Sequence, residues 1–530
     1  MLVLQNIAYA HPNKDVLVSD INLAVNNHEK IALIGNNGTG KSTLLKIIAK
    51  ELQPSSGQIT VDSESYYVPQ IFGQYDHVTV AQALRIDGKL NALHAILDGS
   101  TSDEHFNILD DDWTMEERCR EALKHWQLDN LDWSQKMETL SGGQKTKLFL
   151  AGIDIHQPQL VLLDEPSNHL DMAGRQLLYD LIQNTYSTLI VASHDRALLN
   201  LFDTVCELGK DGIKNYGGNY GFYTEQKQIE NNALCQDIQN REKALRKAKE
   251  KERETRERQQ KRDNRGKAKQ EKTGVARIMM NTLRNTAENT TSKLKAVHSE
   301  KIGGIADDLQ NLRAGLPDID KMQLGFDDST LHKGKILFTA KDINFRYGDT
   351  FLWKENLHFQ VKSGEHLALK GRNGAGKTTL IKLILGSLEP QTGTVYRAEN
   401  QSVYIDQGYS LLDNRLSVYV QAEQYNTTAL QEHEIKIRLN RFLFTKDDWG
   451  KPCSVLSGGE RMRLLLCCLH IGNQSPDLII LDEPTNNLDI QNVRILTAAL
   501  NQYRGTLIVV SHDEMFLEEV GIGRMMELLG

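Results

Sequence analysis

The strongest constraint on the fold of this chain is that its sequence repeats. Four segments of the first half recur, in the same order, in the second half. The matched pairs are IALIGNNGTGKSTLLKIIAKEL (31–52) and LALKGRNGAGKTTLIKLILGSL (367–388), LSGGQKTKLFLAG (140–152) and LSGGERMRLLLCC (456–468), LVLLDEPSNHLD (160–171) and LIILDEPTNNLD (478–489), and LIVASHD (189–195) and LIVVSHD (507–513). This pattern indicates one domain of roughly 220 residues present twice.

Each copy alternates short runs of β-branched residues with helical patterns, which is typical of an α/β domain with a largely parallel sheet. At 530 residues the chain is also too long for a single hydrophobic core. We therefore predict an α/β fold with a first domain at 1–223, a linker at 224–318 and a second domain at 319–530.

The linker has a different composition from the two copies. Between residues 224 and 326 the only aromatic residue is Phe326, and the first proline is Pro317. Such a segment cannot build its own core, but its Ala, Glu, Lys, Arg, Gln and Leu content favours long helices. Gly266 and Gly274 offer a break, which predicts a helical hairpin with limbs of roughly 45–70 Å. A disordered charged linker is the alternative.

Charge is unevenly distributed along the chain. The net charge is −8, yet residues 241–272 hold fifteen Lys or Arg and seven Asp or Glu. An acidic body with a basic segment indicates a polyanionic partner that is met at one place. No apolar run reaches the ~18–20 residues that cross a bilayer, and the N-terminus does not resemble a signal peptide. We expect a cytoplasmic protein with no membrane segment.

Two glycine-rich stretches, GNNGTGKS and GRNGAGKT, match the pattern G-x-x-x-x-G-K-[ST]. Such glycines let backbone N–H groups surround phosphate oxygens at a helix N-terminus. Lys41 and Lys377 then contact the β- and γ-phosphates of ATP, and Ser42 and Thr378 can bind Mg²⁺. The predicted ATP-binding residues of these loops are Gly35, Asn36, Asn37, Gly38, Thr39, Gly40, Lys41, Ser42 and Thr43, and Gly371, Arg372, Asn373, Gly374, Ala375, Gly376, Lys377, Thr378 and Thr379.

Paired carboxylates follow a buried strand pattern in each copy. Asp164 and Asp482 end runs of four aliphatic residues, the mark of parallel strands whose carboxyl ends line a ligand crevice. They are candidate Mg²⁺ ligands. Glu165 and Glu483 follow immediately, within reach of a water in line with the γ-phosphate, and are the candidate general bases.

A histidine stands at the same distance from each of these glutamates. His194 lies 29 residues after Glu165, and His512 lies 29 residues after Glu483. A single buried histidine is usually structural, but the repetition favours a catalytic role for both, in contact with the γ-phosphate.

LSGGQ and LSGGE, each between a phosphate loop and a DEP segment, resemble the signature of ATP-binding cassette (ABC) ATPases. The resemblance covers both copies almost end to end and implies two P-loop ABC ATPase domains in tandem that hydrolyse ATP with Mg²⁺. It also implies D-loops at 168–171 and 486–489. The resemblance further implies that the Q-loop glutamines Gln70 and Gln407 contact Mg²⁺ and the attacking water. Tyr347 would stack on adenine. The signature residues that would contact the nucleotide are Ser141, Gly142, Gly143, Ser457, Gly458 and Gly459.

In this family two cassettes pair head to tail, so that each ATP lies between one phosphate loop and the other signature. The resemblance implies that Lys41 shares a nucleotide with Ser457, and Lys377 with Ser141, in a monomer with intramolecular cassette pairing. Three departures are visible: Glu460 ends the second signature, Lys147 stands where the second copy has Arg463, and the position that matches Tyr347 is His11 in the first copy. None removes a catalytic group, so we predict that both sites hydrolyse ATP.

The tandem layout, LSGGE, NHLD, NNLD and SHDEMFL resemble the ABC-F subfamily, many members of which bind the ribosome. This implies binding at the tRNA exit site in the ATP-bound state, with the linker directed toward peptidyl-tRNA and ribosomal RNA. The protein would be a translation factor or an antibiotic-resistance factor that protects ribosomes. The alternative is the ATPase motor subunit of a transporter with separate membrane subunits. The basic, aromatic-free linker favours the ribosome, since it offers salt-dependent attraction to phosphates.

Two segments have open interpretations. In KQEKTGVARIMMNTLRN (269–285) the candidate RNA contacts are Arg277, Met279, Met280 and Arg284, because flexible Met side chains adapt to irregular surfaces and Arg holds phosphates. The alternative is that the apolar residues of this stretch, Ile278, Met279 and Leu283, merely pack against the first limb and close the hairpin turn. The first copy also carries about twenty extra residues around 99–113, which are acidic. The acidic character of this insert argues against an RNA-binding arm of the subfamily, and a solvated loop explains the insert at least equally well.

Overall fold

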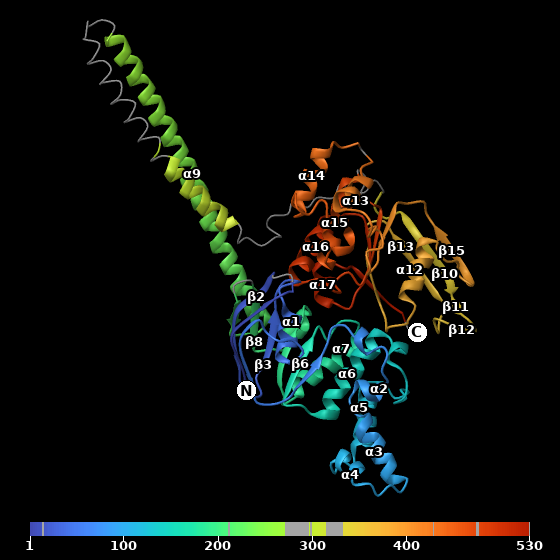
Figure 1. The fold of residues 1–530 in the computed structure, drawn as a ribbon. Helices are drawn as coiled ribbons and strands as arrows, with labels where there is room; N and C mark the ends of the chain where they lie inside the picture. Colours follow the sequence, from blue (N-terminus) through green and yellow to red (C-terminus); the bar gives the residue numbers. More distant parts are fainter. Residues whose placement is uncertain are drawn as a thin grey trace. The chain divides into compact units, whose positions relative to one another are not determined.

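The computed structural model describes the chain except for the residues 13–14, 210–211, 271–295, 297–298, 314–331, 428, 473–475 and 529–530. The chain forms two compact units, one of Met1–Tyr223 with Met322–Gly530 and one of Thr224–Lys321. The first unit contains both copies of the repeat, which are blue to green and yellow to red in Figure 1.

The first copy is built on two sheets. An antiparallel sheet of order β2-β1-β4 comprises β1 (Leu2–Ala10), β2 (Val16–Val25) and β4 (Ser56–Val61). The other sheet has the order β5-β6-β7-β3-β8-β9 and is parallel except for its last pair. Its strands are β3 (Lys30–Ile34), β5 (Ser65–Val68), β6 (Leu160–Asp164), β7 (Thr188–Ala192), β8 (Thr204–Gly209) and β9 (Gly212–Tyr216).

The second copy repeats this design. Its parallel sheet has the order β16-β17-β18-β14-β19, which matches β5-β6-β7-β3-β8 strand by strand. This confirms the prediction of a parallel α/β sheet in both copies. The strands of the second copy are β10 (Ile336–Asn344), β11 (Arg346–Tyr347), β12 (Thr350–Phe351), β13 (Leu357–Lys362), β14 (His366–Lys370), β15 (Thr392–Arg397), β16 (Ser402–Ile405), β17 (Leu478–Asp482), β18 (Thr506–Val510) and β19 (Arg524–Glu527).

Four pairs of helices occupy matching places in the two copies. Further helices in the first copy are α2 (Val80–Ala83), α3 (Asp87–Leu97), α4 (Asp103–Leu109) and α5 (Met115–His125), and in the second copy α13 (Val418–Gln424) and α14 (Glu432–Arg441). The matched pairs are α1 (Lys41–Ile48) with α12 (Lys377–Leu385), α6 (Gly142–His156) with α15 (Gly458–Ile471), α7 (Met172–Asn184) with α16 (Ile490–Gln502), and α8 (Arg196–Leu199) with α17 (Glu514–Glu519).

The parallel sheet of the first copy is buried on both faces. Along β6, Val161 and Leu163 belong to one hydrophobic cluster, whereas Leu160 and Leu162 belong to another. Successive side chains of a strand point to opposite faces, so the sheet lies between two cores. This burial explains why the strands read as unbroken aliphatic runs, and it leaves their carboxyl ends free to carry polar groups.

The acidic insert of the first copy is helical, so the interpretation of residues 99–113 as a solvated loop is wrong. Its central part forms α4, in which Leu109 is buried against Ala92 and Leu93 of α3. The burial of Leu109 is one contact that holds this short helix against α3, and Lys89 of α3 adds an ion pair to Asp112 at 3.2 Å.

The linker unit contains two helical limbs. α9 (Tyr220–Gln270) is one continuous helix of 51 residues, and residues 299–313 are helical as well. Arg241 lies 3.4 Å from Asp308, and Arg313 lies 2.5 Å from Glu242, so the limbs pair side by side. The hairpin interpretation is thereby confirmed for the described limbs, and the disordered alternative does not apply to them.

The break predicted between Gly266 and Gly274 does not begin at Gly266, because α9 continues through it to Gln270, and the remainder of the predicted break lies outside the described residues. The candidate RNA contacts Arg277, Met279, Met280 and Arg284 lie outside the described residues. Across the described parts of the chain, no helix combines the length and the apolar character that a membrane span requires.

Candidate active sites

Each phosphate loop connects a strand of the parallel sheet to a helix, β3 to α1 and β14 to α12. Gly40 and Gly376 directly precede these helices, with φ of 98° and 85°. A Cβ on Gly40 would lie 2.8 Å from the Val18 side chain, so both conformation and space require glycine there. The loops therefore direct backbone N–H groups of a helix N-terminus toward one point, as phosphate binding requires.

The loop lysines lie inside these turns. Lys41 Nζ donates to the Gly35 carbonyl at 2.7 Å and lies 3.0 Å from His194 Nε2. Lys377 Nζ donates to the Gly371 carbonyl, also at 2.7 Å. Burial lowers the pKa of both lysines. Each ammonium group thus stands at the centre of its loop, where a phosphate would meet it.

The two candidate bases share an unusual backbone. Glu165 and Glu483 follow β6 and β17, and their N–H groups donate to the carbonyls of Ala192 and Val510, each at 2.8 Å. Their φ angles are 51° and 49°, in the left-handed region that non-glycine residues rarely occupy. Strained residues of this kind concentrate at active sites, and here the strain recurs at matching positions.

Each glutamate faces its histidine. Glu165 Oε1 lies 3.4 Å from His194 Nε2, and Glu483 Oε1 lies 3.4 Å from His512 Nε2. Burial raises the pKa of both glutamates, that of Glu483 to about 7, and lowers the pKa of both histidines, that of His512 to about 4. A buried carboxylate with a pKa near neutrality suits a general base, and the neutral imidazole can donate or accept a hydrogen bond.

The residues predicted to hold Mg²⁺ supply the oxygen atoms that this ion prefers. Asp164 is buried at the end of β6, hydrogen-bonded by Ser42, and its Oδ1 has no hydrogen-bond partner among the described residues. In the second copy Thr378 Oγ1 lies 3.4 Å from Asp482 Oδ2. Hydroxyl and carboxylate oxygens next to a phosphate loop fit Mg²⁺, which would supply positive charge to neutralise the phosphates there.

Two tyrosines belong to these metal-binding positions, although sequence reasoning did not single them out. Tyr67 OH donates to Asp164 Oδ2 at 3.3 Å, and Tyr404 OH donates to Asp482 Oδ2 at 3.0 Å. They stand at the same place in the repeat, three residues before Gln70 and Gln407. That matched position was the signal that could have found them.

The first phosphate loop shares a cavity with the second copy. This cavity has a volume of about 460 Å³. Its lining includes Lys41, Ser42, Gln70 and Glu165 from the first copy and Ser457 from the second. The structure thus brings together the loop and the signature that the head-to-tail arrangement would pair.

The second phosphate loop lies against the first copy in the same manner. Asn373 Nδ2 donates to the His169 carbonyl at 3.1 Å. A Cβ on Gly143 of the first signature would lie 3.6 Å from the same Nδ2. Asn37 makes the matching contact, since its Nδ2 donates to the Asn487 carbonyl at 3.0 Å. Both loops are therefore held by the opposite copy.

The signature serines start helices α6 and α15. Ser141 and Gln144 form a reciprocal capping box, and Ser457 and Glu460 form the same box. Capping satisfies two free N–H groups and fixes the helix N-terminus that faces the other copy. Glu460 therefore replaces glutamine without loss of the cap.

A sequence model described as "ABC transporter" matches residues 18–168 and 354–486 of this chain. Putative ATP-binding protein YdiF of Bacillus subtilis (strain 168) is 31% identical, over 97% of this chain and 78% of that protein. ABC transporter F family member 5 of Arabidopsis thaliana is 28% identical over 99% and 74%. Erythromycin resistance ATP-binding protein MsrA of Staphylococcus epidermidis is 30% identical over 93% and 90%.

The chain is an ABC ATPase of the F subfamily. It is therefore an ATP hydrolase, as the motifs predict. The two copies of the repeat are its cassettes, and the matched helices α6 and α15 carry their signatures.

The residues predicted to lie at adenine differ between the two cassettes, His11 in the first and Tyr347 in the second. Tyr347 is exposed, and its OH lies 3.3 Å from Thr379 Oγ1 on α12, so the ring stands beside the second phosphate loop. In the first cassette His11 lines the cavity that contains Lys41. The imidazole ring of His11 thus stands in the first cassette where the larger phenol ring of Tyr347 stands in the second.

Of the Q-loop glutamines, Gln70 lines the same cavity, whereas Gln407 is exposed after β16.

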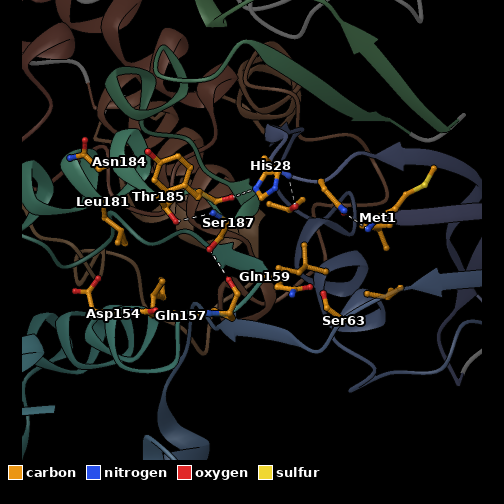
Figure 2. Close-up of a pocket in the computed structure, with 18 of the residues that line it drawn as sticks. Met1, His28, Ser63, Asp154, Gln157, Gln159, Leu181, Asn184, Thr185 and Ser187 are labelled. Carbon is orange, nitrogen blue, oxygen red and sulfur yellow. Dashed lines mark hydrogen bonds between the residues drawn. The ribbon is translucent and has the colours of Figure 1, made fainter. Parts of the chain in front are cut away.

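A larger cavity of about 770 Å³ lies away from the phosphate loops of this ABC protein (Figure 2). Its walls include His28, Asp154 and Tyr186, with Leu160 and Thr188 at the beginnings of β6 and β7. Ligands of parallel α/β sheets bind at the carboxyl ends of the strands, so we assign this cavity no part in ATP binding.

Proposed function

We propose that this ABC-F protein binds the ribosome at the tRNA exit site in its ATP-bound state. The linker hairpin then acts on translation by approaching peptidyl-tRNA and ribosomal RNA. The observation that carries the proposal is the exposed, basic, helical hairpin between two cassettes that share their ATP sites. The name of the Staphylococcus epidermidis relative, an erythromycin resistance protein, supports a role in antibiotic resistance.

The described part of α9 has the surface that docking on folded RNA requires. Arg246, Arg253 and Arg258 are mostly exposed, and each forms an ion pair with a glutamate four residues away. These pairs support the helix, while the surplus of arginine and lysine over residues 241–272 leaves it cationic. Beyond Tyr223, α9 has no aromatic side chain, and a rigid basic helix of this kind fits recognition of RNA by charge and shape rather than by base stacking.

In the proposed reaction, Mg²⁺ and ATP occupy both shared sites. Glu165 and Glu483 accept the proton of the attacking water, while His194 and His512 contact the γ-phosphate. Ser42 with Asp164, and Thr378 with Asp482, would hold the metal, and Gln70 and Gln407 would contact it and orient the water. The signature helix N-termini add donors and positive dipole to the phosphates, so ATP joins the cassettes. Hydrolysis then releases them and ends the ribosome-bound state.

Ribosome co-sedimentation tests the proposal. The double variant Glu165→Gln, Glu483→Gln should pellet with ribosomes when ATP is present, and much less with ADP. Binding should weaken as salt rises, because phosphate contacts release counterions. Absence of ATP-dependent, salt-sensitive binding would contradict the ribosomal role and restore the alternative of a transporter motor subunit.

A matched set of variants tests the linker. In the same double variant, Arg246→Gln, Arg253→Gln and Arg258→Gln should together weaken binding and reduce the slope of log affinity against log salt by roughly 0.7–0.9 per lost phosphate contact. The control changes Glu250, Glu254 and Glu257 to Gln, which removes the same ion pairs but raises the positive charge, and should strengthen binding. Weakening in both sets would mean that only helix stability had been measured.

Growth assays separate the two forms of the proposal. Residues 274–285, which lie outside the described residues, would be replaced by a Gly/Ser segment of equal length. A protein that protects ribosomes from antibiotics should lose drug resistance without a growth defect in drug-free medium. A general translation factor should show the growth defect in both media.

A further inference from the structure

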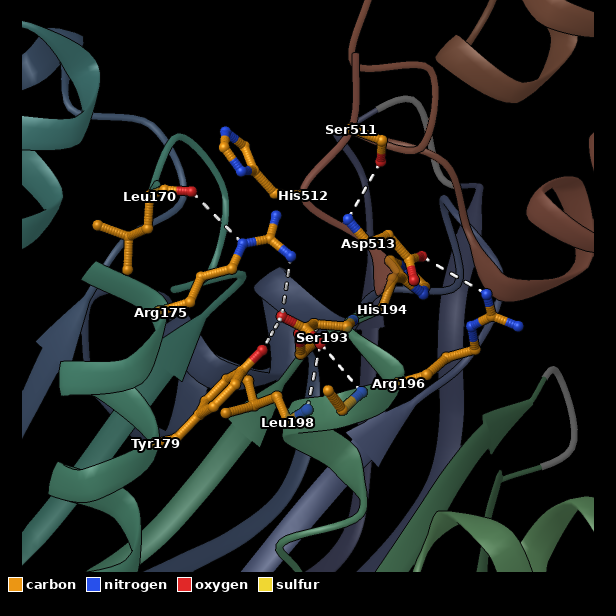
Figure 3. Close-up of polar contacts among 12 residues, drawn as sticks. Leu170, Arg175, Tyr179, Ser193, His194, Arg196, Leu198, Ser511, His512 and Asp513 are labelled. Carbon is orange, nitrogen blue, oxygen red and sulfur yellow. Dashed lines mark hydrogen bonds and ion pairs between the residues drawn. The ribbon is translucent and has the colours of Figure 1, made fainter. Parts of the chain in front are cut away.

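The aspartates that follow His194 and His512 are held in different ways. Asp195 begins α8, where it accepts hydrogen bonds from backbone N–H groups, and its Oδ2 lies 2.9 Å from Tyr179 OH and 3.3 Å from Arg175 Nη1 (Figure 3). Among the described residues, the polar partners of Asp195 all come from the first cassette. This loop is therefore fixed from within.

Asp513 also caps a helix of its own cassette, since its Oδ1 accepts from the Phe516 N–H at 2.9 Å, but its charged partner comes from the opposite cassette. It begins α17, and its Oδ2 lies 3.5 Å from Nη2 of Arg196, a residue of the first cassette (Figure 3). Nη1 of the same guanidinium lies 2.6 Å from Glu519 Oε1 at the end of α17. Arg196 is only 5% exposed, so these are contacts of a buried charge that would be costly to leave unpaired.

The repeat shows that this contact has no mirror image. Val493 stands where the first cassette has Arg175, and Glu514 stands where it has Arg196. Glu514 pairs with Lys370 of its own cassette at 3.0 Å. The second cassette thus lacks the arginine that would fix Asp513 from within, and also the arginine that would reach Asp195.

We propose that Arg196 is a positioning residue, supplied in trans by the first cassette, for the ATP site of the second cassette. By holding Asp513 and Glu519 together it fixes the loop that carries His512, which in turn faces Glu483 at 3.4 Å. The proposal rests on the roles proposed above for His512 and Glu483. It makes the two ATP sites unequal, because closure of the cassettes completes the second site through Arg196, whereas the His194 loop is complete beforehand.

Single-site backgrounds test this inequality. Glu165→Gln leaves hydrolysis to the second site, and Glu483→Gln leaves it to the first. Arg196→Met should lower the steady-state hydrolysis rate at saturating ATP about tenfold in the Glu165→Gln background, since small misplacements of catalytic groups cost up to about 10²-fold. The ATP concentration for half-maximal rate should stay within about twofold, because phosphate contacts are kept. In the Glu483→Gln background the rate should change less than about twofold.

Two further variants serve as controls. Glu514→Gln, at the matching position of the second cassette, should leave both backgrounds unchanged. Arg196→Lys keeps a buried cation but cannot contact two carboxylates as the planar fork does, so it should produce a smaller loss in the same background only. If Arg196→Met does not fold, as judged by thermal unfolding, the lysine variant decides.

Equal losses in both backgrounds would overturn the proposal, since they would show a general contribution to cassette pairing. A normal rate in both backgrounds would overturn it as well. Failure of the premise is distinguishable, because Glu483→Gln alone would then leave the turnover of the second site at the wild-type rate.

Discussion

Asn37 donates its side-chain amide to the backbone carbonyl of Asn487, 3.0 Å away, and so connects the phosphate loop of one cassette to the D-loop of the other. Asn373 makes the same bond to the carbonyl of His169 at 3.1 Å. The two contacts are one interaction repeated with the cassettes exchanged. The conformation of each phosphate loop therefore depends on the D-loop opposite.

We predict that Asn37→Ala and Asn373→Ala each weaken ATP binding at the affected site. A lost hydrogen bond costs about 0.5–1.5 kcal/mol, which corresponds to a rise of roughly two- to tenfold in the dissociation constant. Titration of a fluorescent ATP analogue into the Glu165→Gln, Glu483→Gln protein measures the effect. Asn26→Ala is the control, because among the described residues Asn26 bonds only within its own turn, to Glu29. Unchanged affinity in both variants would show that the contacts do not support ATP binding.

Turnover should depend on both glutamates. Replacing a general base by an isosteric amide typically costs 10²–10⁴-fold in rate, so each single variant should retain only the activity of its intact site. The double variant should bind ATP but release almost no phosphate. Release of phosphate at the wild-type rate by either single variant would refute the assigned role of that glutamate.

Tyr67→Phe and Tyr404→Phe should raise the Mg²⁺ concentration needed for hydrolysis. Each change removes a hydroxyl that orients a metal-binding aspartate, and such outer partners typically contribute 10–100-fold in metal affinity. Phosphate release measured against free Mg²⁺ reports the shift. Tyr66→Phe is the matched control, since Tyr66 OH donates to the Phe149 carbonyl and not to Asp164. An equal shift in all three variants would point to altered packing instead.

Glu460→Gln should strengthen ATP binding at the site that contains Lys41. The amide preserves the capping box with Ser457 and removes a negative charge from the helix N-terminus that would face the phosphates. A charge near a helix terminus changes the energy by about 0.3–1 kcal/mol. Gln144→Glu should weaken the other site by a similar amount, with thermal unfolding unchanged in both variants. Equal affinities would show that Glu460 is too far from the nucleotide to matter.

The order of strands and the location of both sites could be predicted because the decisive signals are local. A glycine-rich turn after an aliphatic run predicts a strand, a loop and a helix. Because the same motif occurs in both copies, each prediction is supported by two independent sequences. Gly266 does not interrupt α9, because the cost of about 1 kcal/mol for one glycine in a helix is small beside the 51 residues that propagate it. The helix α4 was not predicted because its sequence is mostly polar and Leu109 is its one buried residue, which gives no helical periodicity to recognise.

Contacts between the cassettes could not be predicted in detail. Arg196 and Asp513 are 317 positions apart, and no periodicity relates them. Their pairing follows from how two folded bodies meet, which sequence spacing does not encode. Tyr67 and Tyr404 are different, since alignment of the two copies already places them together.

The left-handed backbone of Glu165 and Glu483 has a consequence for stability. Each residue combines a strained φ with a buried carboxylate oxygen that lacks a hydrogen-bond partner among the described residues. Glycine at either position would relieve both, and the nucleotide-free protein should then melt at a higher temperature while losing hydrolysis, whereas glutamine would keep the strain. The nucleotide-free enzyme should therefore unfold at a lower temperature than its inactive glycine variants, because the catalytic conformation lowers thermal stability. ATP binding should raise the unfolding temperature of the active enzyme again.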